Sequence, residues 1–154
     1  MTSVGEHAPN FTLKNCNKED VSLSDYHGKQ VLLAFYPASF SGVCDTELCT
    51  INDNMEFFAS LNTDVIGISV DAPWSNKAFA EKYGLGFELL SDYERKIISS
   101  YDVIFEGLGG LENYVCANRA VFILDKEGRI TFKWVAPNPG VEPDYDEIKS
   151  MIEN

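Results

Sequence analysis

Two continuous apolar runs, joined by a segment with helical periodicity, constrain the fold of this chain more than any other feature. Residues 30–36 and 64–70 are rich in β-branched and aromatic side chains and largely lack polar alternation. Such runs are typical of strands that are covered on both faces. Between them, residues 41–61 carry apolar side chains at three- and four-residue spacing, namely Leu48, Ile51, Met55 and Phe58. This spacing predicts one helix with a buried stripe, and hence a βαβ unit.

The flanking segments continue this alternation. In chain order we expect a hairpin of residues 11–13 and 21–23, a helix over 74–83, a short strand over 87–90, a one-turn helix near 93–100, strands over 119–125 and 129–135, and a helix over 144–153. Gly128 lies in the turn between the last two strands, where a positive φ favours glycine. We therefore predict an α/β fold with a mixed central sheet, helices on both faces and a small N-terminal hairpin.

Length and charge narrow the class of protein. The chain has 154 residues with 45% hydrophobic content, enough for one core, and no repeat or linker divides it, so we expect a single domain over residues 1–154. A net charge of −12 would repel phosphate backbones and anionic lipid, which argues against nucleic-acid and membrane-surface partners. The opening residues do not resemble a signal peptide, and no apolar run approaches the ~20 residues that span a bilayer. We expect a soluble protein of the cytoplasm.

The cysteines and histidines form no metal or disulfide pattern. The four cysteines are too few and too irregularly spaced for a disulfide scaffold, so a reducing compartment should keep them mostly as free thiols: Cys16, Cys44, Cys49 and Cys116. No second Cys or His pair occurs at zinc-ligand spacing. His7 and His27 lie in polar, loop-like segments and are expected at the surface.

Cys44 has the most reactive setting of the four. It falls in the first turn of the predicted helix, just after a strand, where open α/β sheets place their ligands. Backbone amides there lack intrahelical acceptors, and the helix dipole adds about half a positive charge, which favours a thiolate. Ser41, three residues earlier, can cap the helix or reach a group bound beside the sulfur. The alternative is a buried structural cysteine, which is the commoner fate of a Cys on an apolar stripe.

The segment of residues 35–47 resembles the peroxiredoxin signature through four residues at the family's spacing, Pro37, Ser41, Cys44 and Glu47. The opening residues 4–13 resemble the family's usual start, and Arg119 before residues 120–125 resembles its distal arginine. One departure is Ser41, because threonine is commoner there. Serine keeps the hydroxyl but loses a methyl group that helps to fix the rotamer.

This resemblance implies a thioredoxin-like fold and the reduction of hydroperoxides through a Cys44 sulfenic acid, without a metal or an organic cofactor. It also implies a thioredoxin- or glutaredoxin-like reductant, and family members commonly pair, so a homodimer is expected. The Cys-x4-Cys spacing of Cys44 and Cys49 resembles the bacterioferritin-comigratory-protein type of peroxiredoxin, which makes Cys49 the leading resolving cysteine. Cys116 is a second candidate if its loop folds over the site.

Ionisation alone explains little of the expected rate. Lowering the pKa of a thiol from about 8.5 to about 6 raises its thiolate fraction roughly thirtyfold, but lower nucleophilicity removes about tenfold. We therefore expect a lowered Cys44 pKa, with Arg119, Ser41 and the amides near Cys44 orienting the peroxide and stabilising the leaving oxygen. Pro37 would shield the sulfur. Glu47 would orient Arg119, although an acid in a first helical turn is also ordinary dipole complementation.

Regeneration requires a change of shape. Five residues along an ideal helix separate two Cα atoms by roughly 8.7 Å, whereas a disulfide needs less than about 7 Å. The hypothesis is that residues 43–50 unwind when Cys44 and Cys49 join, and Cys49 lies on the polar side with Asp53 and Glu56.

Other functions remain open from the residues alone. A thioredoxin-type thiol-disulfide oxidoreductase would share the fold, but it normally needs Cys-x-x-Cys, which this chain lacks. A peroxide sensor or redox-regulated interaction protein would oxidise Cys44 once, without turnover. An interaction module without redox function would have an unreactive Cys44.

Overall fold

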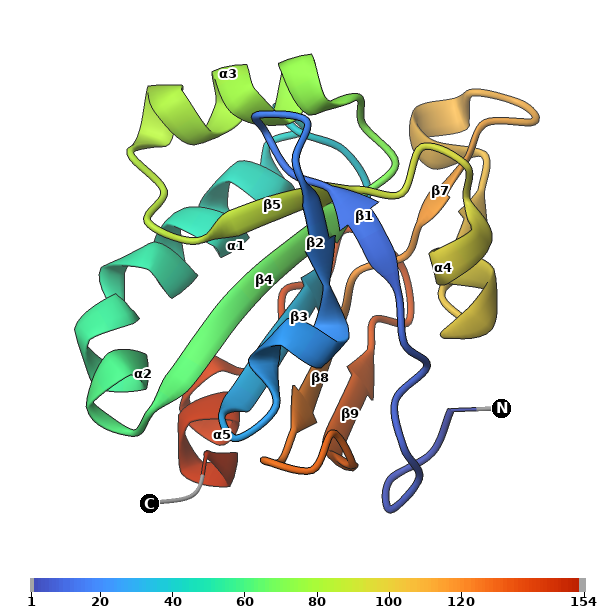
Figure 1. Ribbon diagram of the computed structural model, residues 1–154. Helices are drawn as coiled ribbons and strands as arrows, with labels where there is room; N and C mark the ends of the chain where they lie inside the picture. Colours follow the sequence, from blue (N-terminus) through green and yellow to red (C-terminus); the bar gives the residue numbers. More distant parts are fainter. Residues whose placement is uncertain (1, 153–154) are drawn as a thin grey trace.

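A seven-stranded mixed sheet forms the centre of the computed structural model, which describes residues 2–152 (Figure 1). The three inner strands β5, β4 and β3 run parallel, and every other pair in the sheet is antiparallel. In spatial order the strands are β2 (Asp20–Ser22), β1 (Thr12–Lys14), β5 (Glu88–Ser91), β4 (Thr63–Ser69), β3 (Gln30–Phe35), β8 (Ala120–Leu124) and β9 (Ile130–Val135). The predicted α/β fold with a mixed central sheet is confirmed.

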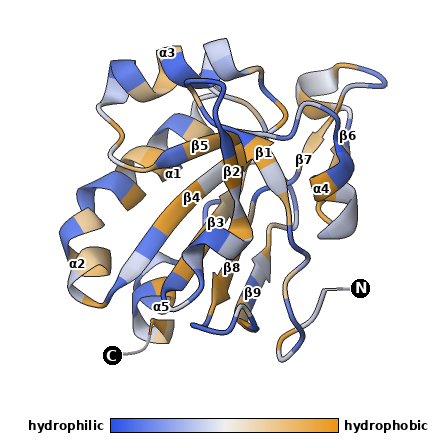
Figure 2. Ribbon diagram, in the orientation of Figure 1, coloured by the Kyte–Doolittle hydropathy of each residue, from blue (hydrophilic) through white to orange (hydrophobic). Residues whose placement is uncertain are grey.

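Alternating side chains of β3 feed two separate apolar clusters. Leu32 and Ala34 pack on one face with helices α1 (Val43–Asp53), α2 (Met55–Ser60), α3 (Pro73–Tyr83) and α5 (Tyr145–Met151). Leu33 and Phe35 pack on the other face, which is covered by α4 (Lys96–Ser100), the short 3-10 helix η1 (Leu23–Tyr26) and the N-terminal segment. Figure 2 shows hydrophobic residues along the middle of the central strands. Burial on both faces explains the unbroken apolar runs.

The predicted helix over residues 41–61 is wrong in its continuity. The structure has two helices, because the backbone leaves the helical path at Asn54, with φ −104° and ψ 13°. The Asn54 side chain donates through Nδ2 to the Thr50 carbonyl at 2.8 Å and accepts at Oδ1 from Lys149. An amide side chain that binds the backbone in this way competes with helix continuation. The helix also begins later than expected, because Gly42 has a positive φ of 78°.

Other expectations hold, with two additions. The helix at 74–83 is confirmed, and Gly128 has the expected positive φ of 82°. The N-terminal hairpin joins the main sheet, because Lys14 pairs with Ser91 of β5. A two-stranded sheet of β6 (Ile104–Glu106) and β7 (Val115–Ala117), linked through η2 (Leu108–Gly110), was not predicted, since its strands are three residues long. The last helix lies within the expected range, whose final residue, 153, is outside the described residues.

The strand directions bring two distant segments to one edge of the sheet. Phe35, the last residue of β3, pairs with Ala120, the first residue of the antiparallel strand β8. Arg119 therefore lies beside the exit from β3, where the chain turns through residues 37–42 into α1. Over residues 2–152, no helix has the length and apolar character needed to cross a membrane.

Gly67 of β4 gives a test of the packing between β4 and β5. A Cβ added at Gly67 would lie 2.6 Å from Cδ2 of the buried Leu89, whereas one added at Gly86 would meet nothing closer than 3.6 Å. We expect Gly67→Ala to lower the free energy of unfolding by about 1–3 kcal/mol through overpacking. Urea titration of both variants measures this, with Gly86→Ala as the control. Equal stability of the two variants would contradict the packing described here.

Candidate active site

Cys44 and Arg119, predicted as partners from opposite parts of the chain, are in direct contact. Cys44 is the second residue of α1 and has no exposed surface. Arg119 precedes β8 and is 1% exposed. Its Nη2 donates a hydrogen bond to Sγ of Cys44 at 3.1 Å. Arg119 is therefore buried beside the sulfur and does not lie at the surface of its strand.

Three further contacts hold the Arg119 side chain and backbone in place. Nη1 donates to Oε1 of Glu47 at 2.7 Å, and Nε donates to the Pro139 carbonyl at 3.0 Å. The Arg119 amide donates to Oδ1 of Asn118 at 2.9 Å. Glu47 thus forms an ion pair with Arg119, and it is completely buried, with Oε2 lacking a partner among the described residues. Pro139 and Asn118 were not predicted, because a backbone carbonyl and a lone amide carry no motif.

The net electrostatic effect on Cys44 differs from expectation. Burial raises the pKa of the Cys44 thiol, while Arg119, the Ala38 amide and the Ser41 hydroxyl act to lower it. The predicted lowering of the Cys44 pKa is therefore wrong for this fully buried arrangement, because a charged sulfur loses its hydration there. Burial likewise raises the pKa of Glu47, to about 7, although Arg119 opposes the shift.

The loop before α1 is tightly turned. Phe40 has a positive φ of 64°, and Gly42 has φ 78° and ψ −76°. The Val43 amide donates to the Ser41 carbonyl at 3.0 Å, which closes a γ-turn around Gly42. The helix has no side-chain N-cap, so Ser41 does not cap it. Its hydroxyl instead acts to lower the pKa of Cys44. The Val43 amide is already engaged and is not free for a peroxide oxygen.

A buried polar network, absent from the sequence analysis, supports this loop. The Ser39 amide donates to Oδ2 of Asp71 at 2.8 Å, and its hydroxyl donates to Oδ1 of Asn76 at 3.1 Å. The Tyr36 hydroxyl donates to the same Asn76 oxygen at 2.8 Å. These residues come from the end of β3, the loop after β4 and helix α3. No spacing in the sequence relates them, and only the packing of α3 on the sheet joins them to the Pro37 loop.

The other cysteines are all free thiols. Cys49 lies in α1 with Cys44, is partly exposed, and has its pKa raised by burial and by Asp45 and Asp53. Cys116 is completely buried in β7, and burial raises its pKa to about 11, with Cys44 adding to the shift. Cys16 is half-buried, and burial raises its pKa also.

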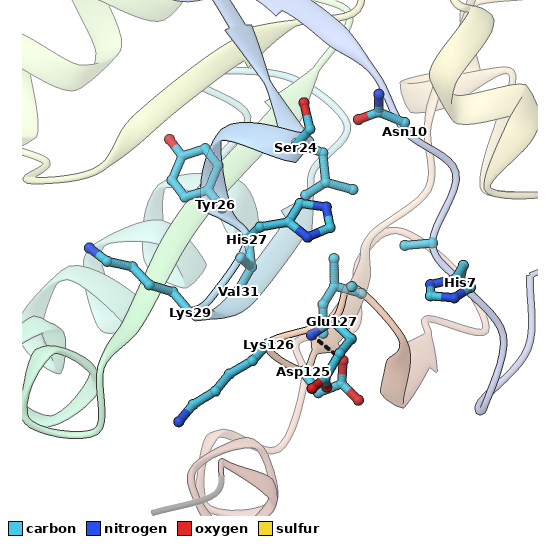
Figure 3. Close-up of a pocket in the computed structure, with 14 residues that line it drawn as sticks. His7, Asn10, Ser24, Tyr26, His27, Lys29, Val31, Asp125, Lys126 and Glu127 are labelled. Carbon is cyan, nitrogen blue, oxygen red and sulfur yellow. Dashed lines mark hydrogen bonds between the residues drawn. The ribbon is translucent and has the colours of Figure 1, made fainter.

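A pocket of about 250 Å³ lies at the opposite end of β3 from Cys44. His7, on the N-terminal segment, and His27, after η1, line it from two sides (Figure 3). Both histidines are exposed, as predicted. Among residues 2–152, no three His, Cys, Asp or Glu side chains gather into a possible metal site.

Burial of Glu47 predicts a pH dependence of stability. The pKa of Glu47 rises from 4.5 to about 7 on folding, so between these values the folded protein binds more protons than the unfolded chain. The resulting contribution to stability is fully present below pH 4.5. This contribution is lost as the pH rises through about 7. We expect the stability of the wild type relative to Glu47→Gln to fall between pH 5 and pH 8, measured as urea midpoints. Glu81→Gln, on the exposed surface of α3, is the control, and a constant difference for Glu47→Gln would contradict the prediction.

Comparison with known proteins agrees with this geometry. The model of the AhpC/TSA family matches residues 4–133. The chain is 39% identical to peroxiredoxin Bcp of Bacillus subtilis, over 85% of this chain and 83% of that one, and 36% identical to peroxiredoxin Bcp of Escherichia coli, over 82% and 81%. It is also 40% identical to the chloroplastic peroxiredoxin Q of Triticum aestivum, over 84% of this chain but 58% of that one.

Solved structures show the same architecture. The reduced 2-Cys peroxiredoxin of Plasmodium vivax superposes with a TM-score of 0.85 and 28% identity, over 99% of this chain and 81% of that one. Peroxidoxin BcpB of Mycobacterium tuberculosis, at 22% identity, supports the fold alone, with a TM-score of 0.86 over 99% and 97% of the two chains. The predicted thioredoxin-like fold is confirmed. A family match across most of the chain, with the expected cysteine and arginine in contact, means that this protein belongs to the AhpC/TSA family and is a peroxiredoxin, a thiol-dependent peroxidase.

Proposed function

We propose that Cys44 is the peroxidatic cysteine and that it reduces hydrogen peroxide and organic hydroperoxides with the help of Arg119. The observation that carries this proposal is the hydrogen bond of 3.1 Å from Arg119 Nη2 to Cys44 Sγ, between two buried side chains. A guanidinium keeps its charge at every physiological pH and presents donors in a fixed plane. Arg119 can therefore favour the thiolate and bind a peroxide oxygen at the same time.

The chemical step balances with the groups of the site and the peroxide. The Cys44 thiolate attacks one peroxide oxygen, the oxygen–oxygen bond breaks, and its electron pair leaves on the second oxygen. The sulfur becomes a sulfenic acid, and the leaving oxygen takes up the proton that the thiol lost, giving water or an alcohol. Arg119 and the Ser41 hydroxyl stabilise the charge that develops on the leaving oxygen.

Burial of the Cys44 sulfur means that a peroxide can reach it only after a local movement of the chain. Because Cys44 is fully covered and the buried Pro37 lies in the turn after β3, a peroxide reaches it when the loop of residues 37–42 moves. The same displacement hydrates the sulfur and removes the burial that raises the Cys44 pKa. Substrate entry and thiolate formation are thus coupled, and in the closed state Pro37 protects the thiol.

Cys49 is the proposed resolving cysteine. It is partly exposed on the same helix, and its thiol displaces the sulfenic hydroxyl as water to form a disulfide with Cys44. Since the cysteines lie in one continuous helix, residues 43–50 must unwind for this step. Cys116 is a weaker candidate, because a pKa near 11 leaves little thiolate at neutral pH. A thioredoxin- or glutaredoxin-like protein then reduces the disulfide.

The free thiols and the net charge bear on the compartment and the partners of the protein. Four free thiols fit a reducing compartment such as the cytoplasm. The net charge of −12 disfavours nucleic-acid partners. We take residues 1–154 to form a single domain that acts as a homodimer.

Rapid oxidation by hydrogen peroxide tests the roles of the two cysteines. Cys44→Ser should abolish rapid oxidation, and Cys49→Ser should keep it but accumulate a sulfenic acid in place of the intramolecular disulfide. Stopped-flow kinetics with mass spectrometry of each product measures both, and Cys16→Ser is the control. Turnover of many peroxides per protein with a reductant separates a peroxidase from a sensor. Unchanged oxidation in Cys44→Ser would refute the assignment.

Arg119 should contribute more to the rate than its charge alone. Arg119→Lys keeps the charge but loses the planar array of donors, so we expect the second-order rate constant of oxidation to fall by about 10²–10³. Arg129→Lys, at the exposed start of the last hairpin strand, is the matched control. A loss below threefold in Arg119→Lys would mean that the guanidinium does not act on the peroxide.

A further inference from the structure

The first turn of α1 is tied to another helix by one short hydrogen bond. The Tyr83 hydroxyl donates to Oδ2 of Asp45 at 2.6 Å. Asp45 directly follows Cys44, whereas Tyr83 is the last residue of α3. The Tyr83 ring packs edge-on against Phe79 at a centroid distance of 5.3 Å, and Phe79 is completely buried. The Tyr83 side chain is thus held in place by packing against a buried residue.

Besides the bonds from Arg119 to Cys44 and Glu47, hydrogen bonds to the end of α3 secure this part of the helix. Gly42 provides no side-chain cap, so the first turn depends on tertiary contacts. A second tie to the same region of α3 lies further along, where Asn52 donates to the Gly84 carbonyl at 3.2 Å and accepts from the Gly86 amide at 2.8 Å. Asn52 is beyond residues 43–50, the segment that must unwind. Of the two ties to the end of α3, only the Tyr83 bond must break.

We propose that Tyr83 is a positioning residue that latches the Cys44 turn of α1 in its peroxide-reactive form and that its hydroxyl must release Asp45 before the Cys44–Cys49 disulfide closes. This inference rests on the proposed role of Cys49. The Asn52 tie stays in place and serves as the fixed end about which the helix unwinds.

The Tyr83–Asp45 hydrogen bond should shift the equilibrium for unwinding of α1 without preventing it. A hydrogen bond to a charged group changes an equilibrium constant by about tenfold or more. The other carboxylate oxygen of Asp45, Oδ1, is buried and has no partner among the described residues. Unwinding returns that oxygen to water, which offsets part of the bond that is lost. The latch therefore changes the opening equilibrium by a moderate factor.

Removal of the hydroxyl should affect the two chemical steps differently. Peroxide attack depends on Arg119 and Ser41, neither of which contacts Tyr83, so its rate constant should change by less than about twofold. Disulfide closure depends on opening, so it should become about three- to tenfold faster. The sulfenic acid then lives for a shorter time, and less Cys44 is over-oxidised at high peroxide.

The test compares Tyr83→Phe with the wild type in the full-length protein. A peroxide pulse followed by acid quench and mass spectrometry gives the rate of Cys44–Cys49 disulfide formation and the share of sulfinic Cys44. Hydrogen exchange of residues 43–50 in the reduced protein reports the opening itself, without any disulfide. Tyr93→Phe, whose side chain is 53% exposed after β5, is the control. Asp45→Asn keeps an acceptor for Tyr83 but loses the charge, so its exchange should lie between those of the wild type and Tyr83→Phe, whereas Asp45→Ala should exchange like Tyr83→Phe.

The outcomes separate this inference from the proposed function. Faster exchange and faster disulfide closure in Tyr83→Phe, without either change in Tyr93→Phe, support the latch. Exchange equal to that of the wild type overturns it, whatever the disulfide kinetics. Absence of a Cys44–Cys49 disulfide in the oxidised wild type instead overturns the role of Cys49, and with it the claim that the latch controls resolution, even if exchange responds to Tyr83.

Discussion

A single buried guanidinium, that of Arg119, is the interaction on which the site depends. Removing a charge from water is costly unless partners surround it, and here Glu47, the Pro139 carbonyl and Cys44 take up its donors. Glu47 therefore does more than complement a helix dipole. It balances Arg119 from one side so that the cation can face the sulfur on the other, and its own raised pKa reflects the cost of that burial.

The same burial has opposite effects on the ionisation of the Cys44 thiol and on the electrostatic effect of Arg119. In the proposed mechanism, burial excludes water, so that Arg119 would act on a peroxide in a medium of low dielectric constant, but it also raises the pKa of the sulfur that must ionise. The proposed opening of the loop of residues 37–42 would resolve this conflict. The network beneath that loop, from Asp71 and Asn76 to Ser39, holds it in the closed position.

Under the role proposed for Cys49, helix α1 must meet two opposing requirements, activation of Cys44 and its regeneration. Its intact first turn places Cys44 against Arg119, yet the same helical geometry keeps Cys49 out of disulfide range. The first turns of α1 must consequently have only moderate stability. A helix without a side-chain cap, held by the Tyr83 bond near Cys44 and by Asn52 beyond Cys49, fits that requirement.

Local patterns in the sequence determined the βαβ unit, the last hairpin and the position of Cys44 in a first helical turn, because periodicity and turn chemistry act over a few residues. Arg119 was indicated by the family resemblance. The sequence could not indicate the break at Asn54 or the Asp71–Asn76 network, since both depend on partners distant in the chain. The β6–β7 pair was not predicted because its strands are three residues long. The sign of the Cys44 pKa shift was also decided by tertiary structure. A helix N-terminus stabilises a thiolate wherever it lies, but the depth of burial, which reverses the net effect here, exists only once both faces of the sheet are covered.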